Sequence, residues 1–497
     1  MRVVYIPLDE RPCNYLFAEK IASGTPVCLV SPPRDALGDK KIAADYDKIK
    51  QFMLDNARSA DAYVLSLDML LYGGIVPSRL HHLSESELIE RLSVLREIKT
   101  INPDVKIYAF ALIMRCPRYS SSDEEPDYYE ECGREIFLVG QIKHKMELGL
   151  IGKAEGESLL AEYAGVIRDN LTDYESRREV NRSLLIKIIG MLGREIDYLI
   201  IPQDDSAEYG YTSMDRESIK IAIREKGLTD VAMYPGADEV GMTLLARAAV
   251  ENAGISPRIF CDFAHENAPN VTPLYEDRPL GKTLPYQINS AGCVRSEDYE
   301  NSDIILFLNY PAREPVEVWQ EKSAGYDERD LDGFAERIKA SVGQDRVSAI
   351  ADGAYCNGGD AELLKLLGER LNLLDLSAYA GWNTSSNTLG TVICQAVFVF
   401  LFGKSKEQNR FLAERIYEDV GYCGYTRAYV TGNILPAMGY DYFNAGESDG
   451  EVAAEVKRVL CQYIGTAFPE IAGKYDVAKC QMPWRRMFEV DLSLVEK

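Results

Sequence analysis

The sequence predicts an α/β protein built on a (β/α)8 barrel. Short apolar, β-branched runs alternate with longer helical patterns, which is the rhythm of parallel strands joined by crossover helices. Two of the runs are weak, at residues 27–30 and 258–263. The eight strong runs cover residues 3–8, 62–67, 106–114, 198–202, 231–234, 304–308, 348–351 and 373–378.

Polar or aromatic residues follow each strong run at the point where the strand ends. Asp9-Glu10-Arg11 follows the first run, and Asp352 follows the seventh. The active site of a (β/α)8 barrel is assembled from the loops after its strands, so eight polar ends favour a barrel. A doubly wound open sheet is the alternative, because it also places ligands at the carboxyl ends of its strands.

The barrel is expected to span residues 1–402. Two segments interrupt its rhythm: a helical, acidic insertion at 116–190, expected to overhang the site, and a loop-like stretch at 264–300. Beyond residue 402 the pattern becomes mainly helical. This predicts a C-terminal region, residues 403–497, that packs on the barrel.

The charge balance and the cysteines restrict the function classes. The 497-residue chain has 78 acidic and 55 basic residues, a formal charge of -23, which disfavours nucleic acid and anionic membranes as partners. The apolar stretch 397–402 is too short to span a bilayer, and no secretion signal is expected. Eleven cysteines, an odd number without a C-x-x-C pair, indicate reduced thiols and a cytoplasmic location.

Only four histidines are present, which argues against a histidine-rich metal centre and against a histidine-based catalytic triad. No cofactor is expected, and no residue is assigned as a metal ligand.

The pair Asp204-Asp205 is the strongest candidate for catalysis. It directly follows the apolar run 198–202. Adjacent carboxylates repel each other, so one pKa rises while the other stays low, which suits a site with one proton donor and one anion. The structural alternative is that one of the two caps the next helix.

The spacing of the pair also limits the mechanism. Ordinary glycosidases place two carboxyl groups on either side of the scissile bond, ~5–9.5 Å apart. Neighbouring carboxylates act more naturally from one side of a substrate. One protonates a leaving oxygen while the other steers a 2-acetamido group, whose own oxygen is the nucleophile.

Further candidates are polar or aromatic residues in the loops after the strands. Arginines such as Arg79 and Arg115 suit bidentate binding of carboxylate or phosphate, with ion pairing to nearby acids as the alternative. Trp382 could stack on a sugar, and asparagine amides recognise hydroxyl groups. Asp238 and Asp360 are alternatively helix N-caps. The candidate substrate-binding residues are Asp9, Arg11, Asn14, Asp68, Tyr72, Arg115, Gln203, Tyr209, Asp238, Glu239, Asn309, Asp352, Asn357, Asp360, Trp382 and Asn383.

Two resemblances follow from these motifs. From Pro7-Leu8-Asp9-Glu10-Arg11-Pro12 to Gly381-Trp382-Asn383-Thr384, the chain resembles a bacterial family of similarly sized proteins known as a domain of unknown function. Locally it is similar to barrel β-N-acetylglucosaminidases of the O-GlcNAcase type. Their Asp-Asp pair, Asn-Tyr-Pro and Tyr-Ala-Trp-Asn motifs match Asp204-Asp205, Asn309-Tyr310-Pro311 and, with one residue inserted, Tyr379-Ala380-Gly381-Trp382-Asn383.

The glycosidase resemblance implies that Asp204 orients the acetamido group and Asp205 is the general acid and base. It further implies that Asn309 and Asn357 bind the sugar. The chain departs from the family pattern in two places. Glu314 takes the position of the acidic residue after Asn-Tyr-Pro, and the first strand ends in Asp9-Glu10-Arg11 rather than in the family's glycine and tyrosine.

These observations predict a cytoplasmic glycoside hydrolase that acts on a small amino-sugar conjugate with retention, by substrate assistance. The expected partner is a small-molecule sugar, with no nucleic acid or membrane, and self-association into a homo-oligomer is left open. One alternative is a hydrolase or isomerase that binds Mg²⁺ or Mn²⁺ through Asp9, Asp68, Asp204, Asp205 and Asp238. The other is a non-catalytic protein that binds a sugar or metabolite.

Overall fold

The main strands form two open parallel sheets in the computed structural model, which describes residues 1–165, 167–322 and 324–497. The chain divides into two compact units. The first comprises Met1–Glu10, Leu29–Gly241 and Tyr275–Asp277, and the second comprises Arg11–Cys28, Met242–Leu274 and Arg278–Lys497.

The first unit is built on a six-stranded sheet with the order β2-β1-β3-β4-β5-β6. The pairings from β1 through β6 are parallel. The central strand β3 is buried along its whole length, as expected when helices cover both faces of a parallel sheet. The strands are β1 (Arg2–Ile6), β2 (Cys28–Val30), β3 (Ala62–Ser66), β4 (Lys106–Phe110), β5 (Tyr198–Ile200) and β6 (Val231–Ala232).

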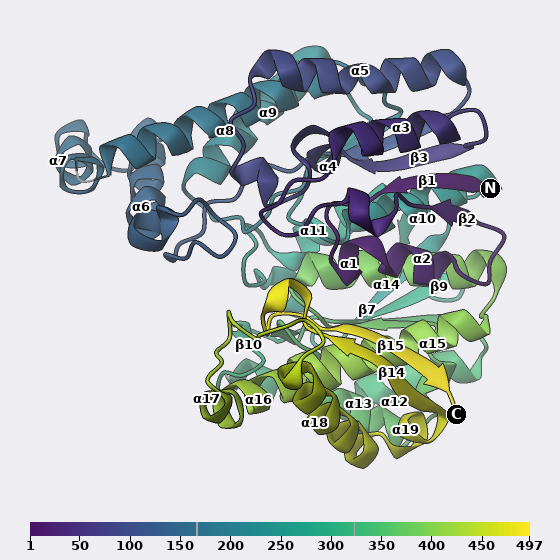
Figure 1. Ribbon diagram of the computed structural model, residues 1–497. Helices are drawn as coiled ribbons and strands as arrows, with labels where there is room; N and C mark the ends of the chain where they lie inside the picture. The colour runs from purple at the N-terminus through teal and green to yellow at the C-terminus, as the bar shows by residue number, and fades with distance from the viewer. Residues whose placement is uncertain (166, 323) are drawn as a thin grey trace. The chain divides into compact units, whose positions relative to one another are not determined.

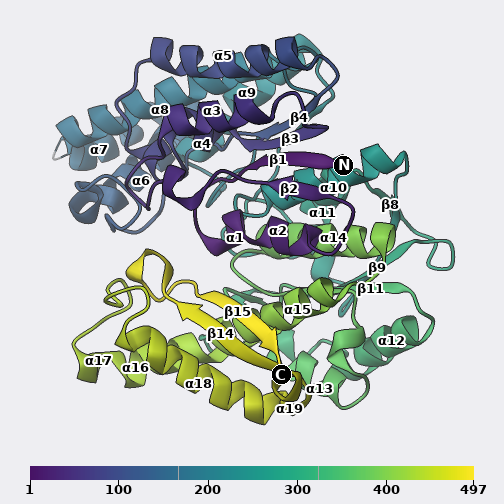
Figure 2. The same cartoon turned by 45° about the vertical axis from the view of Figure 1, so that its right-hand side comes forward.

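Helices pack on this sheet, and Figures 1 and 2 show α3 and α5 on the same face of it. The segment expected to be a helical insertion holds α6, α7 and α8, which share an apolar cluster with the start of α9. The helices of this unit are η1 (Arg34–Ala36), α3 (Tyr46–Asn56), α4 (Leu67–Tyr72), η2 (Pro77–Arg79), α5 (Glu85–Ile101), α6 (Tyr129–Glu147), α7 (Lys153–Ala164), α8 (Arg168–Ile189) and α9 (Tyr211–Lys226).

The second unit repeats the strand order of the first. Its five-stranded sheet has the order β13-β11-β9-β7-β8, and all its pairings are parallel. In each sheet the second strand lies outside the first, and the third, fourth and fifth follow on the other side, which is a doubly wound order. The strands are β7 (Arg258–Phe263), β8 (Val294–Ser296), β9 (Ile304–Asn309), β11 (Val347–Asp352) and β13 (Ala378–Ala380).

Helices cover both faces of the second sheet, with α14 on one face and α12 and α13 on the other (Figures 1 and 2). The apolar helix α14 is long enough and apolar enough to cross a membrane, but 83% of it is buried in the structure, as in a core helix of the fold. The helices up to this point are α1 (Pro12–Tyr15), α2 (Phe17–Ala22), α10 (Val240–Ala253), η3 (Ala268–Asn270), α11 (Leu280–Ser290), η4 (Ala324–Tyr326), α12 (Leu331–Gly343), α13 (Ala361–Gly368), η5 (Leu373–Asp375) and α14 (Ser385–Phe402).

The C-terminal region shares the core of the second unit. Leu412, Val420 and Leu460 belong to the same apolar cluster as Ile305 and Ile350 of the sheet, so the expected boundary at residue 402 lies inside this unit. The region contains an eleven-residue π-helix and ends in an antiparallel hairpin. Its elements are α15 (Lys406–Arg415), the π-helix η6 (Ile416–Thr426), α16 (Arg427–Asn433), α17 (Leu435–Met438), α18 (Glu451–Ala467), α19 (Pro469–Lys474), β14 (Tyr475–Gln481), η7 (Pro483–Arg485) and β15 (Asp491–Glu496); two short strands, β10 (Val316–Glu317) and β12 (Tyr355–Cys356), pair separately.

The strands expected in one closed barrel therefore lie in two open sheets, and the doubly wound alternative describes each sheet. The two weak runs are genuine strands, β2 and β7, and β7 lies inside the second sheet. The segment 264–300, expected to be loop-like, contains η3, α11 and β8; Pro285 inside α11 masks its helical pattern. The last strand begins at Ala378 rather than at residue 373, where a 3-10 turn lies instead.

Candidate functional site

The Asp204-Asp205 pair lies at the carboxyl edge of the first sheet, just beyond β5. Neither residue caps the next helix, because α9 begins at Tyr211 with Gly210 as its N-cap. Each carboxylate is instead bound by an arginine. Arg79 Nη2 donates to Asp204 Oδ2 at 2.8 Å, and Arg115 Nη1 donates to Asp205 Oδ2 at 3.0 Å.

The same two arginines also hold two glutamates from the start of the helical insertion. Arg79 lies 3.1 Å from Glu124 and 3.3 Å from Glu125. Arg115 lies 3.1 Å from Glu124 and 2.7 Å from Glu125. We call Asp204, Asp205, Glu124, Glu125, Arg79 and Arg115 the aspartate cluster; its four carboxyl groups face two guanidinium groups, so a net negative charge remains when all are ionised.

An excess of carboxylates in a buried place favours the uptake of a proton. Burial raises the pKa of Asp204, and the neighbouring charge of Asp205 raises it further, while Arg115 and Arg79 oppose the rise. Glu125 Oε2 is buried and has no hydrogen-bond partner among the described residues. The cluster thus combines a carboxyl that holds its proton more tightly than usual with carboxylates bound to arginine.

The backbone at the pair is strained. Asp205 has a φ of 39°, in the left-handed region that non-glycine residues seldom adopt. Such conformations cost free energy, and they concentrate at functional sites. The strain lies at the same residue whose carboxylate Arg115 holds.

Asp68 belongs to the electrostatic surroundings of the cluster. It lies in the first turn of α4, whose N-cap Ser66 accepts a hydrogen bond from Met69 N at 3.2 Å. Its Oδ2 accepts a hydrogen bond from Leu112 N at 2.9 Å. Burial raises the pKa of Asp68 to about 7, with Arg79 lowering it and Asp204 raising it. Asp68 is therefore a second carboxyl with a raised pKa in this part of the first unit.

A cavity adjoins Asp68 in the first unit, and its space of about 280 Å³ includes volume that is open to solvent. Tyr72, Ser78 and Asn181 supply polar atoms to its wall, and the remaining lining is apolar. The ring of Tyr72 stacks on His81 at 4.6 Å between centroids. The cavity therefore lies beside a carboxyl whose pKa is raised to about 7.

The other candidates in the first unit are dispersed. Gln203 donates to Asp277 at 2.9 Å, and Glu239 accepts from the backbone of Ala237 at 2.9 Å. The centroid of the Tyr209 ring lies 5.3 Å from Lys145 Nζ. Asp9 and Asp238 are buried.

In the second unit, Asn309, Asp352 and Asp360 form a buried network with Arg329. Asn309 Nδ2 donates to Asp352 at 2.9 Å, and Arg329 Nη1 donates to Asn309 at 2.7 Å and to Asp360 at 2.8 Å. All three candidates are at most 2% exposed, so their hydrogen bonds stabilise the buried ends of β9 and β11. Asp360 is also the N-cap of α13, as the sequence alternative predicted.

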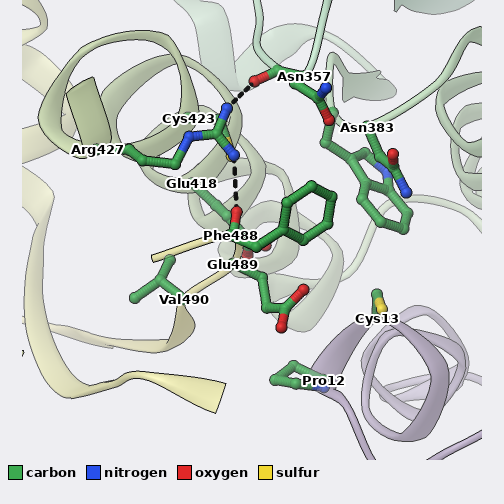
Figure 3. Close-up of a pocket in the computed structure, with 11 residues that line it drawn as sticks. Pro12, Cys13, Asn357, Asn383, Glu418, Cys423, Arg427, Phe488, Glu489 and Val490 are labelled. Atoms are coloured by element: carbon green, nitrogen blue, oxygen red, sulfur yellow. Dashed lines mark hydrogen bonds between the residues drawn. The ribbon is translucent and has the colours of Figure 1, made fainter. Parts of the chain in front are cut away.

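The remaining candidates of this unit gather at a second pocket. Asn357, Trp382 and Asn383 line it together with Glu418 and Arg427, and it holds about 380 Å³ of space, part of which is open to solvent. Figure 3 shows Arg427 hydrogen-bonded to the backbone of Asn357 and of Phe488.

Two other candidates adjoin this pocket. Arg11 lies 3.7 Å from Glu489, one of the pocket residues, and Asn14 donates to Cys13 Sγ at 3.7 Å. The predicted site residues therefore belong to two separate units, with the aspartate pair in the first and the asparagine–tryptophan set in the second.

Several site residues were not identified from the sequence. Glu124 and Glu125 lie in an acidic stretch of the insertion, and that stretch was the available signal. Glu418 and Arg427 lie in and directly after the π-helix, which has no sequence pattern of its own. No group of three or more histidine, cysteine or acidic side chains suited to a metal ion occurs in the part of the chain that the structure describes.

Fold and sites together define an α/β protein with two doubly wound units and polar groups at the carboxyl edges of its parallel strands. The chain belongs to the family described as "Protein of unknown function (DUF4127)", whose model matches residues 3–493. The resemblance to a family of unknown function is thus confirmed. No curated protein and no solved structure matches the chain. The local resemblance to O-GlcNAcase-type enzymes stays a prediction.

Proposed function

We propose that this protein is a hydrolase that cleaves the glycosidic bond of a small amino-sugar conjugate, with Asp204 and Asp205 as the reacting carboxyl groups. One observation carries the proposal: two adjacent carboxyl groups at a strand end are held by different arginines, and burial together with the charge of Asp205 raises the pKa of Asp204. Pairs of acids whose surroundings separate their pKa values are how acid and base roles are divided in enzymes.

The surroundings support a particular division of roles. Arg79 binds Oδ2 of Asp204, and burial together with the charge of Asp205 favours the protonated form. We assign Asp204 as the acid that protonates the leaving oxygen. This exchanges the roles that the family resemblance implies for the two residues.

Asp205 is then the anion that orients the substrate. Arg115 binds one of its oxygens at 3.0 Å, which fixes the carboxylate. In the substrate-assisted scheme, Asp205 accepts a hydrogen bond from the acetamido N–H and turns the amide oxygen toward the anomeric carbon. That oxygen forms the new bond as the leaving group departs with the proton from Asp204, and water afterwards opens the cyclic intermediate with overall retention.

A panel of aryl N-acetylhexosaminides, assayed with the whole protein, tests the proposal. We expect turnover of at least one member, and a loss of about 10²–10⁴-fold in kcat for Asp204→Asn. The matched control is Asp47→Asn, an exposed aspartate of α3 in the same unit, which should leave kcat unchanged. Equal rates for the wild type, Asp204→Asn and Asp205→Asn would remove the assignment.

The same panel separates the two alternatives that the sequence left open. A divalent-metal-dependent hydrolase or isomerase would lose its activity on chelation and regain it with Mg²⁺ or Mn²⁺. A non-catalytic sugar-binding protein would be stabilised against heat by the sugar without turnover. We also propose a cytoplasmic location and a small-molecule partner, on the basis of the unpatterned cysteines and the acidic charge.

A further inference from the structure

The pocket of the second unit has structural marks of a ligand site that are independent of the aspartate cluster. Its wall is formed by residues of α1, the loop after β12, the loop after β13, the π-helix and the segment before β15. The loop after β13 follows a strand of the doubly wound sheet, at the edge where such proteins place their ligands. The residues that line the pocket come from distant parts of the sequence, from Pro12 to Val490.

Two residues of the pocket wall have a strained backbone. Asn357 has a φ of 61° and Asn383 a φ of 51°, both in the left-handed region. The two residues are joined, because Asn357 N donates to the carbonyl of Asn383 at 2.8 Å. Left-handed non-glycine residues cost free energy, and they persist where the surrounding structure fixes them, often at binding sites.

The π-helix supplies another part of the wall. It runs for eleven residues, Ile416–Thr426, and contributes Glu418 and Cys423 to the pocket. π-helical turns are rare and occur frequently at functional sites, because the wider turn shifts the side chains that follow it. Arg427, the next residue, enters the pocket from this shifted position.

The guanidinium of Arg427 is the decisive group. Arg427 is 3% exposed, and it donates to the carbonyls of Asn357 and Phe488 at 2.5 and 2.7 Å (Figure 3). Within the described ranges no carboxylate lies within ion-pair distance of it. The ionisable groups in its electrostatic surroundings are Cys423, Tyr442, Tyr422 and Glu317. Glu317 is the carboxylate among them, and it accepts a hydrogen bond from Asn357 Nδ2 at 2.9 Å.

The carboxylates of the pocket already have arginines of their own. Glu418 pairs with Arg415, and Glu489 pairs with Arg486 at 3.3 Å. Arg427 is therefore a buried cation that lines a pocket without a carboxylate bonded to it. A buried charge is costly when no opposite charge is bonded to it, so an anion bound against Arg427 would offset part of that cost.

We infer that this pocket binds a small organic acid, with the carboxylate against Arg427 and an apolar body against Phe488 and Trp382. Guanidinium groups suit carboxylates because two N–H groups can donate in parallel. The flat rings of Phe488 and Trp382 suit a short apolar or aromatic body. The amides of Asn357 and Asn383 recognise a further polar atom of the ligand.

Isothermal titration calorimetry of the whole protein with sodium benzoate tests the inference. Benzamide is the neutral probe of equal shape, inorganic phosphate is a different anion, and N-acetylglucosamine is a neutral sugar. We expect saturable binding of benzoate with one site per chain, at least tenfold tighter than benzamide, phosphate or the sugar. Tighter binding of the sugar or phosphate than of benzoate, or no saturable benzoate binding, would overturn the inference.

Two variants localise the binding to this pocket. Asn383→Asp keeps a residue that tolerates the left-handed backbone and adds a negative charge to the wall, so it should weaken benzoate at least tenfold. Asn301→Asp, an exposed asparagine of the same unit, should bind benzoate as the wild type does. Arg427→Gln should abolish the preference for benzoate over benzamide. Unchanged benzoate binding in Asn383→Asp contradicts the inference even if Arg427→Gln fails to fold.

Discussion

Arg79 Nη2 lies 2.8 Å from Asp204 Oδ2, although 125 positions separate the two residues. Arg79 comes from the turn η2 after α4, and Asp204 follows β5. The same guanidinium holds Glu124 and Glu125, so it joins three loops at the carboxyl edge of the first sheet. The aspartate cluster is therefore part of the architecture of this edge as well as a candidate for chemistry.

Arg79→Gln should destabilise the first unit strongly. The arginine side chain is 2% exposed and pairs with three carboxylates, so its removal leaves Asp204 without a bonded arginine and leaves Glu124 and Glu125 with Arg115 as their shared counter-ion. Breaking a buried pair by removing one member costs about 3–5 kcal/mol. Urea unfolding checks this, with Arg313→Gln as control: Arg313 pairs with Glu328 at an exposed site, where about 0–1 kcal/mol is expected. Equal losses for the two variants would contradict the role of Arg79.

Glu124→Gln should move the alkaline limb of the pH–rate profile to lower pH. The charge of Glu124 contributes to the raised pKa of Asp204, after burial and the charge of Asp205. If Asp204 acts as the acid, activity is lost as the pH rises through its pKa, so removing a contribution that raises the pKa lowers that limit. The control is Glu131→Gln, an exposed residue of α6. A limb that stays in place or moves to higher pH excludes Asp204 as the titrating acid.

Asp68 should make the protein more stable in mild acid than at slightly alkaline pH. Its pKa is about 7 in the folded protein and about 3.9 in an unfolded chain, so the folded state binds the proton more tightly. The contribution is complete below the unfolded value and is lost as the pH rises through about 7. Between pH ~5.5 and ~8 it amounts to about 2 kcal/mol of unfolding free energy.

Urea titrations of the wild type and Asp68→Asn at both pH values measure this contribution. Asn keeps an oxygen for Leu112 N and does not titrate, so the variant should lose less stability on going to the higher pH. Asp47→Asn, at an exposed position, should follow the wild type. Parallel pH dependence of the wild type and Asp68→Asn would show that Asp68 does not titrate in this range.

The N-cap Asp360 should contribute more than an ordinary cap. Asp360 caps α13 and also pairs with the buried Arg329 at 2.8 Å, whereas Asp330 caps α12 at an exposed position. Asp330→Ala should cost about 1 kcal/mol, the usual value of a cap. Asp360→Ala should cost about 3–5 kcal/mol, because it leaves the Arg329 charge buried without its carboxylate. Similar losses in thermal or urea unfolding would mean that the buried pair adds nothing to the cap.

The alternation of strands and helices could be predicted from the sequence, but the closure of the sheet could not. Each βα segment shows its apolar run and its polar end locally, whereas the order of strands depends on contacts between distant segments. The weak run 258–263 illustrates this. This run is partly exposed and contains charged residues, so the sequence pattern does not indicate that it is the first strand of the second sheet. The sequence therefore predicts one eight-stranded barrel, whereas the structure has one six-stranded and one five-stranded sheet.

The site could be predicted in part for the same reason. Asp204 and Asp205 were identifiable because they directly follow a strand, and strand ends are where α/β proteins place polar groups. Glu124 and Glu125 were not, since nothing local indicates that an acidic loop folds back onto Arg79 and Arg115. Asn309 and Asp352 also lie at strand ends, yet the structure uses them to satisfy a buried arginine.

The central claim is tested most directly by how the loss of kcat/KM in Asp204→Asn depends on the leaving group of the substrate. We would measure kcat/KM for aryl N-acetylhexosaminides with a poor and a good leaving group, for the wild type and the variant. Loss of the acid should slow the poor leaving group by at least tenfold more than the good one, because the good one departs without a proton. A loss that is the same for both substrates, or no loss for either, would contradict the role of Asp204 as the proton donor.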